Sequence, residues 1–286
     1  MRGPPTERSL AARLAFGVVC IDKPAGPSSH QVAAWVRDAL GVDRAAHAGT
    51  LDPKVTGVLP VLLSAATRCV PAMVAAPKEY VAVCELHGEP LVPLESVLAQ
   101  FTGALYQKPP RKSAVARRLR ERTVYALEQL ERDGRRVLLR IRCESGTYIR
   151  KLCHDIGLAA GCGAHMGDLR RTASGPFDDT ALVSTTALTD ALAADGDAAL
   201  DAMVLPGEAA MAHLPQVTIA ESAAATVADG APVFAPGVRA VDAAAREPGT
   251  LVACATPDGA VVCLGRTTAA IAADHGEAVR LEAVLV

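Results

Sequence analysis

The sequence predicts an α+β protein with a second, small β-barrel domain at its C-terminal end. Helical and strand patterns mix over the first two thirds of the 286 residues without a βαβ repeat. After Pro215, short β-rich runs are separated by Gly and Pro, as in compact barrels. Half of the residues are hydrophobic and 21% are charged, which is a globular composition. We therefore expect one domain over 1–210, including an N-terminal extension over 1–15 that packs on the C-terminal domain, and a second domain over 211–286.

The N-terminal third is predicted to begin with a strand and a capped helix. Residues 16–21 are β-rich and end at the turn-forming segment 22–27. Ser28 and Gln31 have the spacing of a capping box, apolar residues follow at helical spacing, and Gly41 stops the helix. Residues 44–60 hold turn formers and show no period, so they predict an ordered loop.

The middle of the chain is predicted to hold strands, a hairpin and two helices. The expected elements are a buried strand over 80–86, a short helix over 94–101, a hairpin of 124–130 with 137–143 around Asp133-Gly134, and a helix over 147–160. Composition then changes: residues 173–210 are acidic, Ala-rich and helical in pattern. The β-rich runs that follow are 215–219, 231–234, 250–255, 260–266 and 278–285.

Charge is distributed unevenly along the chain. The formal net charge is −2, but residues 101–172 carry a net charge of +9 and residues 173–286 a net charge of −11. The densest part, Lys108 to Arg122, holds seven cations and one acid, and its Pro-Pro pair predicts a loop that opens into a strand. Two interpretations remain open at this point, a nucleic-acid contact that weakens with salt and a solvated basic loop.

Eight cysteines occur, and no two of them form a CxxC pair. Cys153-His154 with Cys162 and His165 is a poor match to zinc-ligand spacing, so we expect no metal and reduced, buried thiols in a cytoplasmic protein. No stretch of 18 apolar residues lacks a charge, Gly or Pro, and the N-terminus lacks a secretory signal pattern. These features exclude a membrane-spanning helix.

Four residues are candidates for chemistry, each with a structural alternative. Asp52 lies in Gly-Thr-Leu-Asp-Pro, where an aspartate is either a turn residue or a reactive carboxylate. His47 is either structural or a polar contact for a ligand. Arg150 opposes the dipole at the start of its predicted helix, which favours a nearby carboxylate or phosphate. Tyr80 is either core or the stacking surface of a nucleobase pocket.

Six segments together resemble the TruB-type pseudouridine synthases, and most closely the archaeal, dyskerin-like catalytic subunit of box H/ACA ribonucleoproteins. The resemblance is dense over about residues 16–177. The segments are GVVCIDKPAGPSSHQV (17–32), HAGTLDPKVTGVLP (47–60), KEY (78–80), QKPPRKSAVARRLRER (107–122), GTYIRKLCHDIG (146–157) and GAHMGDLRRTASGPF (163–177). It implies a catalytic domain with a mixed, largely antiparallel sheet and a PUA-like domain at the C-terminal end.

The resemblance also assigns roles to residues. It makes Asp52 the catalytic residue and Arg150 its ionic partner, because a carboxylate held by a guanidinium stays ionised. It places Tyr80 under the flipped uracil, lets His47 help to displace the base, and has Lys23 support the site. Tyr148 and Leu169 would line the pocket. The implied RNA contacts are Lys108, Arg111, Lys112, Arg117, Arg118, Gly230 and Gly237.

The implied reaction breaks the N-glycosidic bond of a uridine, turns the uracil and rejoins it through C5. It needs no redox step, so no cofactor or metal is expected. The implied partners are a box H/ACA guide RNA, target rRNA and tRNA, and small ribonucleoprotein subunits. A stand-alone synthase for the tRNA T-loop uridine is the nearest alternative. A non-catalytic RNA scaffold and a two-carboxylate glycoside hydrolase, which would need a second acid beside Asp52, are more distant ones.

Overall fold

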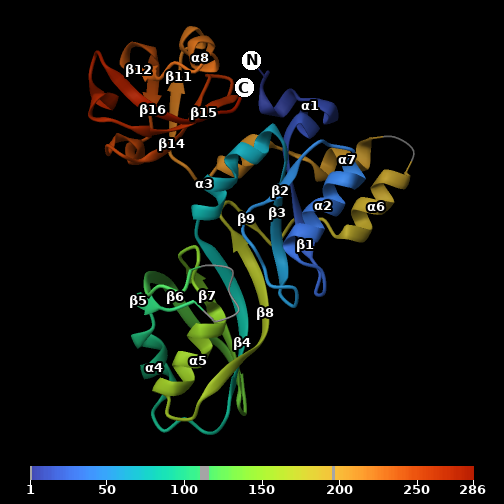
Figure 1. Ribbon diagram of the computed structural model, residues 1–286, viewed down its shortest axis with the longest axis vertical. Helices are drawn as coiled ribbons and strands as arrows, with labels where there is room; N and C mark the ends of the chain where they lie inside the picture. The colour runs from blue at the N-terminus through green and yellow to red at the C-terminus, as the bar shows by residue number, and fades with distance from the viewer. Residues whose placement is uncertain (1, 110–115, 195–196) are drawn as a thin grey trace.

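A ten-stranded mixed sheet forms the framework of the first two thirds of the chain (Figure 1). The computed structural model describes residues 2–109, 116–194 and 197–286. The strands follow the order β10-β1-β3-β8-β4-β7-β6-β5, with β2 added beside β3 and β9 beside β8. Their bounds are β1 Phe16–Lys23, β2 Ala45–His47, β3 Thr56–Ser64, β4 Lys78–Leu86, β5 Gly103–Gln107, β6 Arg120–Asp133, β7 Arg136–Cys143, β8 Ala164–Ser174, β9 Phe177–Asp178 and β10 Leu205–Pro206.

Helices cover the two ends of this sheet separately. In Figure 1, α1, α2, α6 and α7 gather around β1–β3, and α4 and α5 lie against the end formed by β4–β7. The bounds are α1 Leu10–Ala15, α2 Ser29–Leu40, α3 Val70–Ala75, α4 Leu94–Gln100, α5 Ile149–Ala159, α6 Thr185–Ala193 and α7 Ala198–Met203. Each end therefore has its own apolar cluster, with α2 packed on β1 and β3 in one and α5 packed on β4 and β7 in the other.

The two ends of the sheet meet where β3 pairs in parallel with β8. Gly57 lies opposite Arg171, and a Cβ at Gly57 would stand 2.1 Å from the Arg171 carbonyl oxygen. Gly57 also has a φ of 103°, which side-chain-bearing residues rarely adopt. Only glycine therefore permits this close pairing, which brings the loop before β3 next to the middle of β8.

A six-stranded, barrel-like sheet forms the C-terminal domain. Its order is β12-β16-β15-β14-β11-β13, and β11 and β14 run parallel. Its elements are β11 Gln216–Ile219, α8 Glu221–Ala228, β12 Val233–Phe234, β13 Val238–Val241, β14 Leu251–Ala255, β15 Val261–Thr267 and β16 Glu277–Val284. In the part of the chain that the structure describes, no helix is long and apolar enough to cross a membrane.

Most of the predicted elements are confirmed, including the α+β class and the barrel-like C-terminal sheet. Both hydrogen bonds of the capping box form, one between the Ser28 side chain and the Gln31 amide and one between the Gln31 side chain and the Ser28 amide. Gly41 ends α2 with a φ of 62°. The prediction of one ordered loop over 44–60 is wrong. Ala45–His47 form β2, and Thr56 begins the long strand β3, which is buried on both faces and therefore shows a continuous apolar run without a period. The sequence also missed β5, β8, β13 and α8.

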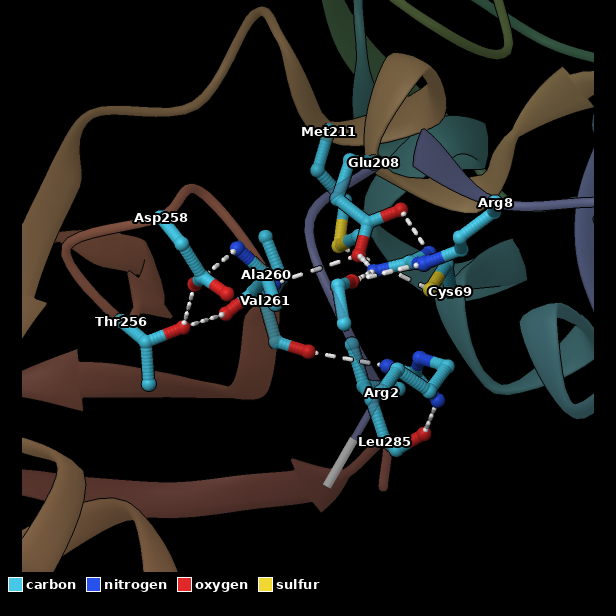
Figure 2. Close-up of polar contacts among 11 residues, drawn as sticks. Arg2, Arg8, Cys69, Glu208, Met211, Thr256, Asp258, Ala260, Val261 and Leu285 are labelled. Carbon is cyan, nitrogen blue, oxygen red and sulfur yellow. Dashed lines mark hydrogen bonds and ion pairs between the residues drawn. The ribbon is translucent and has the colours of Figure 1, made fainter. Parts of the chain in front are cut away.

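The N-terminal segment joins the two domains through the buried Arg8 and the half-buried Arg2. Arg8 donates to Glu208 at 2.7 and 2.9 Å, and the Glu208 carboxylate accepts from the Val261 amide of the C-terminal domain at 3.2 Å (Figure 2). Arg2 lies over the Phe16 ring and donates to the carbonyl oxygens of Val261 and Leu285. A shared apolar cluster surrounds these contacts, since it takes residues from both sheets.

Removing the buried guanidinium of Arg8 should destabilise this junction. Arg8→Met leaves the carboxylate of Glu208 without its charged partner in a largely buried site, and we expect unfolding to become easier by about 3 kcal/mol. Urea denaturation followed by circular dichroism measures this. Arg140→Met removes an exposed pair with Glu128 and should cost less than about 1 kcal/mol. Equal losses in the two variants would contradict a structural role for the junction.

Candidate active site

Asp52 lies on the irregular segment 48–55 between β2 and β3. Buried Leu51 and Val55 anchor the segment on either side, and the Asp52 side chain is 55% exposed. The Ser29 hydroxyl, at the start of α2, accepts from the Leu51 amide at 2.8 Å and contacts its carbonyl oxygen at 3.1 Å. The Val55 amide closes a turn onto the Asp52 carbonyl at 2.9 Å. A rigid loop therefore presents a carboxylate to solvent.

Arg150 forms an ion pair with Asp52. It stands in the first turn of α5, and its guanidinium donates to the Asp52 carboxylate. A cation at this end of a helix opposes the helix dipole, and the carboxylate offsets that cost. The pair is half-exposed, so both groups are close to each other and open to a ligand.

Buried cations hold the loop from beneath by its carbonyl oxygens. Lys23, fully buried at the end of β1, donates to the carbonyl oxygens of Pro53 at 3.0 Å and Val55 at 2.8 Å. Arg171, 1% exposed on β8, donates to the carbonyl oxygens of Val58 at 2.7 Å and Gly49 at 3.2 Å. Burial and the Arg171 charge lower the pKa of Lys23, while Asp52 raises it.

A third buried cation, Lys78, caps a neighbouring helix. Its ammonium donates to the carbonyl oxygens of Met73, Val74 and Ala76 at 2.7–3.1 Å, at the C-terminal end of α3. Burial, with a further contribution from Arg171, lowers the pKa of Lys78 to about 7. Lys78 begins β4, so this cap fixes the strand that carries Tyr80.

Tyr80 and Leu169 lie on neighbouring strands beside α5, the helix that carries Arg150. Tyr80 on β4 is paired with Arg171 on β8, and Leu169 lies two residues away along β8, opposite Ala82. Both side chains are half-buried against the apolar cluster under α5. Burial raises the pKa of Tyr80, and a hydrogen bond with the Arg171 guanidinium lowers it in part. An aromatic ring and a leucine thus lie together at the edge of this core.

Tyr148 is the residue before α5, and a buried glutamine holds its backbone. Gln107 is 2% exposed, its side-chain oxygen accepts from the Tyr148 amide at 2.8 Å, and its amide group donates to the Tyr148 carbonyl at 3.2 Å. No pattern in the sequence indicated Gln107, Ser29 or Arg171. Each of these side chains is hydrogen-bonded to backbone atoms of a distant segment. The only sequence evidence for them is that they lie inside the segments that resemble the TruB family.

His47 ends β2, five residues before Asp52. Its ring meets His30 edge-on, with centroids 4.5 Å apart. Burial, His30 and Arg171 lower the pKa of His47 to about 4, and its Nδ1 is buried without a hydrogen-bond partner. His47 is therefore a neutral imidazole at neutral pH.

The predicted RNA contacts lie away from the ion pair in sequence. Lys108, Arg117 and Arg118 are exposed between β5 and β6, whereas Arg111 and Lys112 fall outside the described residues. Gly230 and Gly237 flank the short strand β12 of the C-terminal domain, and Gly230 has a φ of 94°. Within the described ranges, no group of three or more His, Cys, Asp or Glu side chains is arranged to hold a metal ion.

Four family descriptions match consecutive parts of the chain. They are "DKCLD (NUC011) domain" over 3–33, "TruB family pseudouridylate synthase (N terminal domain)" over 37–90, "tRNA pseudouridylate synthase B C-terminal domain" over 150–212 and "PUA domain" over 215–285. A protein of Halobacterium salinarum named "Probable tRNA pseudouridine synthase B" is 60% identical, and the match covers 100% of this chain and 99% of that protein. One of the same name from Haloarcula marismortui is 57% identical, over 100% and 94%.

Solved structures agree with these matches. A chain in the crystal structure of a Cbf5–Nop10–Gar1 complex superposes with a TM-score of 0.93 at 45% identity, covering 100% of this chain and 89% of that one. A chain in the structure of an H/ACA ribonucleoprotein bound to a substrate RNA containing 2′-deoxyuridine gives a TM-score of 0.91 at 42% identity, covering 99% and 90%.

Acid should destabilise the protein through His47. The unfolded imidazole binds its proton near pH 6.5 and the folded one only near pH 4. Between these values the unfolded state holds more protons, so the free energy of unfolding falls as the pH falls from about 6.5 to about 4, and His47 has no effect above that range.

His47→Gln should remove part of this dependence. We expect the variant to lose about 1–2 kcal/mol less stability than the wild type between pH 7 and pH 4, measured by urea denaturation. The exposed His275 provides the control, because His275→Gln should keep the wild-type profile. An unchanged profile in His47→Gln would show that the buried imidazole is protonated as readily as a free one.

Proposed function

The chain belongs to the TruB family and is an RNA pseudouridine synthase; we propose that it isomerises specific uridines in rRNA and tRNA under the direction of a box H/ACA guide RNA. Asp52 is the catalytic residue in this proposal. The observation that carries it is the half-exposed Asp52–Arg150 ion pair at the tip of a loop held rigidly from beneath. Membership of the family removes the glycoside hydrolase and scaffold alternatives.

Asp52 would act as an ionised carboxylate. The Arg150 guanidinium orients one carboxylate oxygen, which leaves the other for the substrate. The N-glycosidic bond breaks, the uracil turns while it is held, and a bond forms from the ribose to C5. The hydrogen on C5 leaves as a proton, and N1, released from the ribose, gains a proton, so the product is an isomer of uridine. The atoms balance without oxidation or reduction, so the reaction needs no cofactor or metal.

The uracil would be held by the pocket beside the ion pair. The target atoms are hidden in a stacked helix, so the nucleotide must be flipped out. Tyr80 supplies a π-face on which the base stacks, and Leu169 and Tyr148 line the sides. Neutral His47 helps to displace the base, and Lys23 positions the catalytic loop through the carbonyl oxygens of Pro53 and Val55.

Guide-directed action is supported by the solved relatives. The chain covers about nine tenths of chains solved as parts of H/ACA complexes, including the PUA domain. We therefore propose a guide RNA and small subunits of the Nop10 and Gar1 kind as partners. The curated relatives are named for tRNA, which favours stand-alone activity on tRNA as the second candidate. All eight cysteines are free, which supports a reducing, cytoplasmic location.

The RNA would be gripped at two places. The basic segment with Lys108, Arg117 and Arg118, together with Arg111 and Lys112, would clamp the target strand. The C-terminal domain would hold the guide RNA near Gly230 and Gly237. At Gly230 the space beside the missing side chain is open, which lets a phosphate approach the backbone closely, whereas at Gly237 Ala223 fills that space.

Replacing Asp52 by Asn should stop the reaction without weakening RNA binding. RNA labelled with tritium at uracil C5 releases the label only when the base is rejoined through C5. With guide RNA and subunits present, we expect Asp52→Asn to lower the single-turnover rate of release at least about a thousandfold. Its Kd for RNA should stay within about threefold of the wild type.

Asp155→Asn is the matched control, since Asp155 is also an ion-paired aspartate and lies on the same helix as Arg150. It should release tritium at close to the wild-type rate. Release that survives in Asp52→Asn would contradict the catalytic assignment, and release from tRNA without any guide would favour the second candidate.

Binding of the target should weaken with salt in proportion to the basic segment's charge. Each phosphate contact contributes about 0.7 to the slope of log K against log salt for single strands. The double variant Arg117→Ala/Arg118→Ala should therefore reduce the slope by about 1.4, measured by fluorescence anisotropy between low and high KCl. A slope unchanged by the double variant would exclude both arginines from the RNA contact.

A further inference from the structure

Arg171 is the largest fully buried side chain of the protein, and it has an unusual set of partners. In the part of the chain that the structure describes, it forms no ion pair with a carboxylate. Two other buried cations, Lys23 and Lys78, are close enough for the positive charge of Arg171 to lower the pKa of each. Burying a charge without a counter-ion is costly, and an apolar side chain of similar volume would fill this space more cheaply.

The guanidinium is bonded to two carbonyl oxygens of one half of the proposed site and lies beside Tyr80 of the other half. Its Nε donates to the Val58 carbonyl at 2.7 Å, and its Nη2 donates to the Gly49 carbonyl at 3.2 Å. These carbonyls lie on either side of the segment that carries Asp52. Tyr80 is directly opposite Arg171 on the neighbouring strand β4, and the Tyr80 hydroxyl and the Arg171 guanidinium shift each other's pKa. One rigid, planar fork is therefore bonded on both sides of the catalytic loop and lies next to the residue on which the base would stack.

The geometry points to Arg171 as a positioning residue that fixes the Tyr80 ring relative to the Asp52 carboxylate. This inference rests on the proposed function and deepens it: Arg171 touches no reacting atom, and it acts through Tyr80 and the backbone of the loop. The carboxylate and the stacked base must keep their separation while the uracil turns. A displacement of about 1 Å between reacting groups can cost about a hundredfold in rate.

The guanidinium fork is essential to this role. A lysine keeps the positive charge, and its ammonium can donate to several carbonyl oxygens around one point, as Lys78 does. It lacks the separate Nε and Nη2 donors with which Arg171 holds the Val58 and Gly49 carbonyl oxygens in one plane. Arg171→Lys should therefore preserve much of the stability and lose the alignment. Arg171→Met removes both the charge and the fork.

The first experiment separates alignment from folding by kinetics. Single-turnover tritium release is measured with the full assembly for Arg171→Lys, Arg171→Met and the control Arg8→Met, with RNA Kd and Tm for each. Arg8 is also a buried arginine bonded to a backbone carbonyl, but it lies at the domain junction. We expect Arg171→Lys to lower the rate about a hundredfold with Kd within about threefold. Arg8→Met should lower Tm with a rate that follows its folded fraction.

A double-mutant cycle tests the route through Tyr80. Tyr80→Phe removes only the hydroxyl that Arg171 contacts. If the two residues act together, Arg171→Lys/Tyr80→Phe will be within about threefold of Arg171→Lys alone. Losses that multiply, or a rate in Arg171→Lys that falls only as far as its folded fraction, would overturn the inference.

Hydrogen exchange of backbone amides tests the role of Arg171 without an activity measurement. The amides of Ala48, Leu51 and Val55 are hydrogen-bonded within or beside the loop. In Arg171→Lys we expect their exchange to accelerate at least about tenfold while the α5 amides stay protected, and in Arg8→Met we expect no local change. Unchanged exchange in the loop would overturn the inference even in an active enzyme. Faster exchange in a chain without synthase activity would instead count only against the proposed function.

Discussion

The structure depends on hydrogen bonds from buried cations to the carbonyl oxygens of one loop. Lys23 and Arg171 come from strands on opposite sides of β3, and together they bind carbonyls before and after Asp52. Carbonyl oxygens accept charge-assisted hydrogen bonds but carry no formal charge. The loop is therefore held firmly by groups that add positive charge and no negative charge beneath the Asp52 carboxylate.

The parallel contact between β3 and β8 makes this arrangement possible. The residues of the site lie far apart in the chain, and the hydrogen-bonded Gly49 and Arg171 are 122 positions apart. Gly57 lets the two strands approach until Arg171 reaches under the loop, and the turn after β7 returns α5 so that Arg150 closes over it from above. The two ends of the sheet, each with its own apolar cluster, thus lie on either side of the Asp52 carboxylate. The packing of the two clusters holds the loop and α5 in place relative to each other.

Patterns of the sequence were sufficient for elements with a strong local signal. The capped helix α2, the hairpin of β6 and β7, and the helix that carries Arg150 have such signals, and so do most of the barrel strands. Long-range effects account for the failures. β3 is buried on both faces, which removes alternation, β8 shows no regular alternation of buried and exposed residues, and β2 is three residues long. From residue types alone, Asp52 was either a turn residue or a reactive carboxylate, and Arg150 and Tyr80 were candidates with structural alternatives. Only the family-like segments assigned them roles. Arg171 and Gln107 were invisible because their partners are backbone atoms of distant segments.

In the proposed function, an RNA guide chooses the uridine that Asp52 modifies. Mapping pseudouridine at single-nucleotide resolution in one target RNA, with two guides of different complementarity, tests this most directly. We expect the modified position to move when the guide is exchanged, and Asp52→Asn to leave both positions as uridine. Modification of the same uridine with either guide, or with none, would contradict it.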